Sequence, residues 1–131
     1  MLLQAIRKEY IVIDEQLVDF INLYFLIDNN WYCSSFGEGE SNFSKIEDSL
    51  VLLNEEDENY SHKIISVPIP ENLVNIINIS TMSFNNFDYG LLIEFENNDF
   101  ITFFEDNDEH SYLYFMKFIY QENTNLKKIE F

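Results

Sequence analysis

The sequence contains little of the residues that constrain or loosen a backbone. One cysteine, Cys33, two prolines and three glycines occur in 131 residues. A lone cysteine excludes an internal disulfide, and the first residues lack the apolar run of a secretory signal, so we expect a reducing, cytoplasmic setting. Scarce glycine and proline, with 47% hydrophobic residues, argue against disorder. We therefore expect one folded domain over residues 1–131.

Basic residues and long apolar runs are also scarce. Seven Lys and Arg against 24 Asp and Glu give a formal charge of −17, and the excess is spread over both halves of the chain. Such a surface repels nucleic acid backbones and anionic membranes, so we expect neither as a partner. The longest apolar runs have five residues, whereas a membrane-spanning helix needs about 18. Solubility and attraction to a basic partner are the usual physical uses of this charge.

Residues that could catalyse a reaction are few and lie in no recognisable signature. Nucleophilic catalysis needs a nucleophile beside a base, and the candidates are Cys33, His62 and His110. Glu94 and Glu96 fall on one face of an expected strand, where two carboxylates could serve as acid and base. A solvated sheet face explains this pair equally well. We predict no catalytic residue and no enzymatic activity.

Metal and phosphate sites are also not indicated. The acidic run at residues 105–109 offers oxygen ligands, yet it lacks the glycine turn and the distant glutamate of an EF-hand loop. Gly37-Glu38-Gly39 places an acid where a phosphate would approach. We expect no metal and no cofactor.

Residues 89–105 carry the clearest strand pattern. Apolar side chains occupy every second position from Leu91 to Phe95, which is typical of a half-buried strand. Asn97-Asn98 tolerates the positive φ angles of a tight turn, and an aromatic, β-branched segment follows it. The sequence therefore predicts a hairpin at the centre of a mainly antiparallel sheet.

Further strands are expected before, between and after the helical segments. They are a strand ending near Ile13, Trp31–Phe36, His62–Ile69 and Leu126–Phe131. Pro68 lacks the donor that a central strand needs, so the third of these should lie at a sheet edge or end at Pro68.

Helical spacing predicts four helices packed against the sheet, at about 15–28, 45–53, 71–78 and 109–121. In the first, Asp14 suits an N-cap and apolar residues follow from Leu17 at i, i+3, i+4 and i+7. Ser44 to Glu47 matches a capping box, and Pro70-Glu71 can open a short helix. Residues 112–120 also fit the alternation of a strand, and we prefer a helix there because acidic residues precede it. The predicted fold class is α+β.

Acidic clusters with neighbouring aromatic residues are the candidate binding sites. Binding hot spots favour aromatic anchors inside a polar rim, so tyrosines beside acids can hold a basic partner. The predicted partner-binding residues are Glu55, Glu56, Asp57, Glu58, Tyr60, Glu105, Asp106, Asp108, Glu109, Tyr114 and Phe118.

In its size, acidic balance, lack of export and catalytic signatures and mixed order of helices and strands, the chain resembles the small acidic immunity proteins of bacterial contact-dependent growth inhibition and other polymorphic toxin systems. The resemblance implies a protein that neutralises a basic toxin, such as a nuclease, by covering its active site or substrate-binding surface. A nucleic-acid mimic that inhibits a DNA-binding protein is an alternative, as is an adaptor without an inhibitory role. An enzyme with a pocket lined by His62 or His110 is a further one. The sequence leaves the partner's identity, the stoichiometry and the oligomeric state open.

Overall fold

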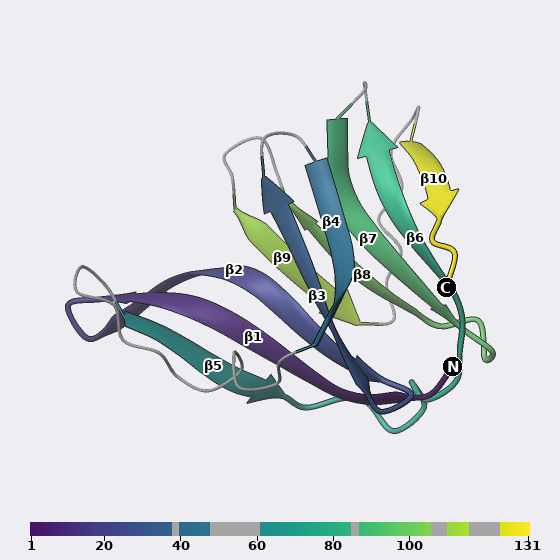
Figure 1. Ribbon diagram of the computed structural model, residues 1–131, viewed down its shortest axis with the longest axis horizontal. Coiled ribbons are helices and arrows are strands. Elements are labelled where there is room, and N and C mark those ends of the chain that lie inside the picture. Colours follow the sequence, from purple (N-terminus) through teal and green to yellow (C-terminus); the bar gives the residue numbers. More distant parts are fainter. Residues whose placement is uncertain (38–39, 48–60, 85–86, 106–109, 116–123) are drawn as a thin grey trace.

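A computed structural model describes residues 1–37, 40–47, 61–84, 87–105, 110–115 and 124–131, and all regular secondary structure in these residues is β-strand (Figure 1). The strands are β1 (Leu3–Ile13), β2 (Gln16–Ile27), β3 (Asn30–Gly37), β4 (Glu40–Ile46), β5 (Ser61–Val67), β6 (Ile76–Phe84), β7 (Phe87–Phe95), β8 (Phe100–Glu105), β9 (Ser111–Phe115) and β10 (Thr124–Lys128). Every pairing between them is antiparallel.

The strands form two sheets with the same topology. Their orders are β4-β3-β2-β1-β5 and β10-β6-β7-β8-β9, so in each sheet four strands follow one another and the fifth returns beside the first. The repeat extends to the register. Leu3 pairs with Ile27 and Ile6 with Phe25 in the first sheet, as Ile76 pairs with Phe95 and Ile79 with Ile93 in the second, and in both a register shift follows the first of these pairs. Residues of one half therefore have structural equivalents in the other.

The starts of β1 and β6 pair with each other and join the two halves. Leu2 and Asn75 form an antiparallel bridge. The amide of Ile76 donates to the Met1 carbonyl at 2.7 Å, and the amide of Leu3 donates to the Val74 carbonyl at 2.9 Å. The bridge joins equivalent segments of the two halves, and these segments run in opposite directions. The two halves are therefore related by a pseudo-two-fold axis that passes through this bridge.

The core lies between the two sheets. It consists of the inward side chains of both, namely Leu3, Ile6, Leu23, Phe25, Ile27, Leu73, Ile76, Ile79, Leu91, Ile93, Phe95, Ile101 and Phe103. Across the core β4 contacts β7 and β2 contacts β9, which are equivalent contacts under the pseudo-two-fold relation. The sheets are thus offset, and β6 and β10 extend past the β4 edge.

The predicted α+β class, with helices packed against a sheet, is wrong for the described residues. The segment 15–28, expected as a helix, forms β2. Its spacing fitted a helix because the strand is apolar on both faces: Leu23 and Phe25 point into the core, while Tyr24 on the opposite face is also buried. Asp14 and Glu15 form a tight turn at φ 51° and 62° instead of a helix N-terminus.

The other three predicted helices are also contradicted where the structure describes them. Residues 45–46 end β4, and 71–72 form a turn before the extended segment that pairs with the N-terminus. In the range 109–121, residues 111–115 form β9, so the strand alternative was correct there. Residues 45–46, 76–78 and 111–115 belong to β4, β6 and β9, and pairing with neighbouring strands there overrides the weak helix signals. The rest of these ranges, 48–53, 109 and 116–121, lies outside the described residues.

Several strand predictions are confirmed. The chain forms strands up to Ile13, across Trp31–Phe36 and, within the predicted final strand, up to Lys128. The strand before Pro68 is β5, at the edge of its sheet. The predicted hairpin is β7 and β8, with β7 in the middle of the second sheet and Asn98 at φ 66° in the turn.

Candidate protein-binding surface

Most of the predicted partner-binding residues lie outside the described residues. These are Glu55, Glu56, Asp57, Glu58 and Tyr60 of the first cluster, and Asp106, Asp108, Glu109 and Phe118 of the second. Glu105 ends β8 opposite Ser111, and Tyr114 lies in β9 opposite Thr102. Because side chains alternate along a strand, Glu105 and Tyr114 occupy opposite faces of the sheet. They do not share one binding surface.

Tyr114 belongs to an aromatic stack on the outer face of the second sheet. The Phe104 ring centroid lies 5.1 Å from that of Tyr112 and 5.7 Å from that of Tyr114, and the two tyrosine rings are parallel within 2°. All three residues are half-buried. Phe104 and Tyr112 were not predicted as binding residues, although the strand alternative for 112–120 places Tyr112 and Tyr114 on one face.

A second surface forms at the end of the molecule that holds the N-terminus, and one half of it is the β2–β3 turn. Asp28 and Asn29 occupy this turn at φ 47° and 64°. The Leu2 amide donates to Asp28 Oδ1 at 2.8 Å, and the Asn29 amide donates to Gln4 Oε1 at 2.7 Å. These bonds fix the Asp28 carboxylate beside the start of β1.

The other half is the β7–β8 turn with the segment before β6. Asn72 Nδ2 donates to Asp99 Oδ2 at 2.6 Å, and Asn97 Nδ2 donates to the Asn72 carbonyl at 2.8 Å. The Glu96 amide donates to the Asn75 carbonyl at 3.0 Å. A cavity of about 230 Å³ lies between the two segments, lined by Glu71, Asn72, Val74, Asn75, Phe95, Glu96 and Asn97.

The two halves are equivalent under the pseudo-two-fold relation. The Asp28 amide donates to the Leu2 carbonyl at 3.1 Å, as the Glu96 amide donates to that of Asn75 at 3.0 Å. Both turns flank the bridge between Leu2 and Asn75, and Figure 1 shows them gathered around the N-terminus.

We call this surface the acidic end and define it by Leu2, Asp28, Glu71, Asn72, Val74, Asn75, Glu96, Asn97 and Asp99. It carries four carboxylates, and its positive group is the neighbouring Met1 ammonium, which donates to the Ile76 carbonyl. Two of its aliphatic side chains remain open to solvent: Leu2 is 42% and Val74 37% exposed. The acidic end thus combines apolar residues, surrounding carboxylates and a backbone held by hydrogen bonds between distant segments.

Sequence reasoning missed this surface because its carboxylates do not form a run. They come from three segments, and each looks like an ordinary acidic loop in the sequence. Turn residues at Asp28-Asn29 and Asn97-Asn98 were the available signal, but the sequence does not say that these turns meet.

A partly buried polar network lies on the outer face of the first sheet. Glu9 Oε1 accepts hydrogen bonds from Asn22 Nδ2 at 2.7 Å and from the Tyr24 hydroxyl at 2.8 Å, and Glu9 Oε2 lies 2.9 Å from His62 Nδ1. The Glu9 side chain is 12% exposed and that of His62 22%. The network joins β1, β2 and β5, so Glu9 and His62 have a structural role.

The same network disfavours ionisation of its neighbours. Burial, followed by the Glu9 hydrogen bond and charge, raises the pKa of Tyr24. Burial, with the charge of Glu9, raises the pKa of Cys33 to about 11. The Cys33 thiol is therefore protonated at neutral pH, which is the unreactive form.

The described residues show no grouping of three or more His, Cys, Asp or Glu side chains that could hold a metal ion. No helix among them is long and apolar enough to cross a membrane. Comparison of the chain with protein-family models, with curated proteins and with solved structures finds no match.

Proposed function

We propose that this protein is a stoichiometric inhibitor that binds a basic protein partner through the acidic end. The observation that carries the proposal is the arrangement there: carboxylates of Asp28, Glu71, Glu96 and Asp99 around the exposed Leu2 and Val74. Protein interfaces have this layout, with apolar contacts at the centre and polar groups at the rim.

The acidic end is held rigid before binding, and the negative charge of the protein speeds association with a basic partner. The two turns are held by hydrogen bonds of 2.6–3.1 Å to segments that precede β1 and β6, so little conformational entropy is lost on association. The formal charge of −17 steers a cationic partner toward the protein and can raise association rates by about ten-fold or more at low salt.

Within this class we propose an immunity protein that acts in the cytoplasm on a basic toxin such as a nuclease. A nuclease binds phosphates with a positively charged groove, which an acidic, preformed surface can occupy in place of the substrate. The resemblance in size and acidity to immunity proteins of polymorphic toxin systems supports this reading.

The test first asks whether the open reading frame next to this gene encodes a basic domain, and then produces that domain together with this protein. We expect a one-to-one complex on size-exclusion chromatography and rescue of growth when the domain is toxic. A Glu71→Gln/Glu96→Gln variant should associate about three-fold to ten-fold more slowly at low salt.

The matched control is Asp14→Asn/Glu15→Gln. It removes the same two charges, at the tip of the β1–β2 hairpin, which Figure 1 places at the opposite end of the molecule. This variant should associate at nearly the wild-type rate. Equal slowing in both variants would show that net charge alone acts, and the absence of any complex with the neighbouring domain would refute the inhibitor.

A further inference from the structure

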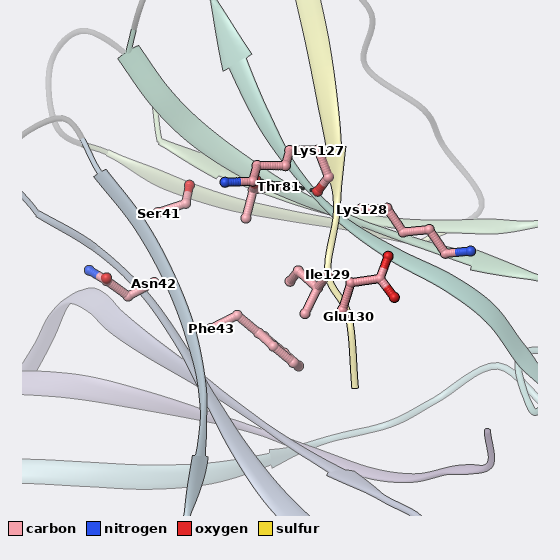
Figure 2. A pocket seen from close by; sticks show the side chains of 8 residues that line it. All are labelled: Ser41, Asn42, Phe43, Thr81, Lys127, Lys128, Ile129 and Glu130. Atoms are coloured by element: carbon pink, nitrogen blue, oxygen red, sulfur yellow. Dashed lines mark hydrogen bonds between the residues drawn. The ribbon is translucent and has the colours of Figure 1, made fainter.

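A groove lies between β4, at the edge of the first sheet, and β10, at the edge of the second (Figure 2). Its volume is about 420 Å³, within the range of small-molecule pockets. It exists because β6 and β10 extend past the β4 edge, so the β4 edge faces the inner side of these two strands. Its lining residues are Ser41, Asn42, Phe43, Thr81, Lys127, Lys128, Ile129 and Glu130.

Lys127 is the unusual residue of this groove, because a cation occupies an inward-facing position. It pairs with Thr81, which pairs with the buried Leu91, so all three side chains lie on the core side of the sheet. The equivalent position in the first sheet is Ile65, opposite Lys8. Each half thus has one lysine in this inward-facing pair: in the first sheet it stands on β1, and in the second sheet it stands on β10, beside the β4 edge.

The Lys127 ammonium has no ion-pair partner in the part of the chain that the structure describes. This is notable in a chain with 24 acidic residues and seven basic ones. Figure 2 shows its side chain extending across the groove toward Ser41 of β4, whereas the Lys128 side chain turns away from β4. One positive charge therefore points into the groove.

Lys128 and Glu130 also belong to the lining, but in Figure 2 both side chains extend from β10 on the side away from β4. The other lining residues are apolar or neutral and polar. Phe43 and Ile129 point into the groove in Figure 2. The Phe43 ring is stacked on Tyr32 with centroids 5.2 Å apart, and the Phe131 ring meets Phe43 edge-on at 6.0 Å. These contacts fix one flat apolar wall. Ser41, Asn42 and Thr81 add neutral polar groups around it.

We infer that this groove binds a small monocarboxylate with an apolar body, independently of the proposed inhibitor function. The carboxylate pairs with Lys127, and the apolar body lies against Phe43 and Ile129. A single inward ammonium compensates one negative charge, whereas a polyanion such as a nucleotide would be repelled by a globule of formal charge −17. The same repulsion disfavours a second copy of this chain as the occupant.

The test is a titration of the ¹⁵N-labelled protein with 3-phenylpropionate, followed by NMR shifts of the Ser41, Phe43 and Thr81 amides. The neutral isostere 3-phenylpropanamide is titrated in parallel. Lys127→Gln is the test variant, and Lys128→Gln is its matched control, because it removes the same charge from the neighbouring residue. Thermal melting of both variants checks that they fold as the wild type does.

We expect saturable shifts of these amides with a dissociation constant of about 1 mM or lower. Lys127→Gln should raise this constant at least about five-fold, and Lys128→Gln should change it less than about two-fold. The amide should bind at least about five-fold more weakly than the acid. Absent shifts at about 10 mM, equal binding of acid and amide, or equal losses in the two lysine variants would each refute the carboxylate site.

Discussion

Removing one oxygen atom from the Glu9 network, the hydroxyl of Tyr24, should lower the stability of the protein by a measurable amount. Tyr24→Phe removes the hydroxyl that donates to Glu9 Oε1 at 2.8 Å. Tyr24 is 4% exposed, and phenylalanine fills the same space, so no cavity is created. A hydrogen bond to a charged group contributes about 1.5–3 kcal/mol. Because Glu9 keeps its contacts with Asn22 and His62, we expect a loss of about 2 kcal/mol.

Urea unfolding, followed by circular dichroism, measures this loss as a lower midpoint with an unchanged m-value. Tyr32→Phe is the matched control, since in the described residues its hydroxyl makes no hydrogen bond while its ring packs on Phe43. It should change stability by less than about 0.5 kcal/mol.

A double-mutant cycle with Glu9→Gln assigns the energy to this pair. We expect a coupling energy of about 1 kcal/mol, because glutamine still accepts the hydrogen bond but carries no charge. A loss below about 0.5 kcal/mol for Tyr24→Phe, or a coupling near zero, would refute the stabilising role of the network.

Three further predictions concern pH, packing and a turn. Burial raises the pKa of Cys33 from its ordinary 9.0 to about 11. The folded state therefore holds this proton more tightly than the unfolded state, so the contribution of Cys33 to the free energy of unfolding should be complete below pH 9 and be lost as the pH rises toward 11. Urea titrations across this pH range should show the fall, and Cys33→Ala should show a smaller one. Gly90→Ala should cost about 1–3 kcal/mol in thermal or urea unfolding, because its Cβ would overlap the buried Met82 and lie 3.2 Å from the Phe103 carbonyl oxygen; an unchanged midpoint would contradict this packing. Asn98 adopts a φ of 66°, which strains alanine but not glycine. Asn98→Ala should therefore lower the free energy of unfolding by about 1 kcal/mol, whereas Asn98→Gly should keep wild-type stability.

Features set by local chemistry could be predicted from the sequence. Asn98 accepts a positive φ, so the β7–β8 hairpin was predictable. Pro68 cannot donate a backbone hydrogen bond, so it was predictable that β5 lies at an edge or ends there; β5 does both, since it ends at Val67. The strong negative charge follows from composition and needs no fold.

The helix-or-strand choice for residues 15–28 was decided by tertiary structure. Apolar residues on both faces of β2 fit helical and extended spacing alike, and pairing with β1 and β3 selects the strand. Tyr24 shows why. Its side chain ends in a polar hydroxyl, yet it is buried because Glu9 on the neighbouring strand accepts a hydrogen bond from that hydroxyl. The partner that makes this burial favourable is 15 residues away.

Both candidate sites depend on contacts between distant segments. The acidic end exists because the β2–β3 and β7–β8 turns meet beside the bridge between Leu2 and Asn75. The groove exists because the offset of two sheets leaves Lys127 facing the β4 edge. The sequence by itself determined the charge, the tight turns and the edge strand, since each depends on one residue type and its neighbours. The meeting of carboxylates in one place and of a lysine with an aromatic wall in another was decided by the tertiary structure, because only folding brings these segments together.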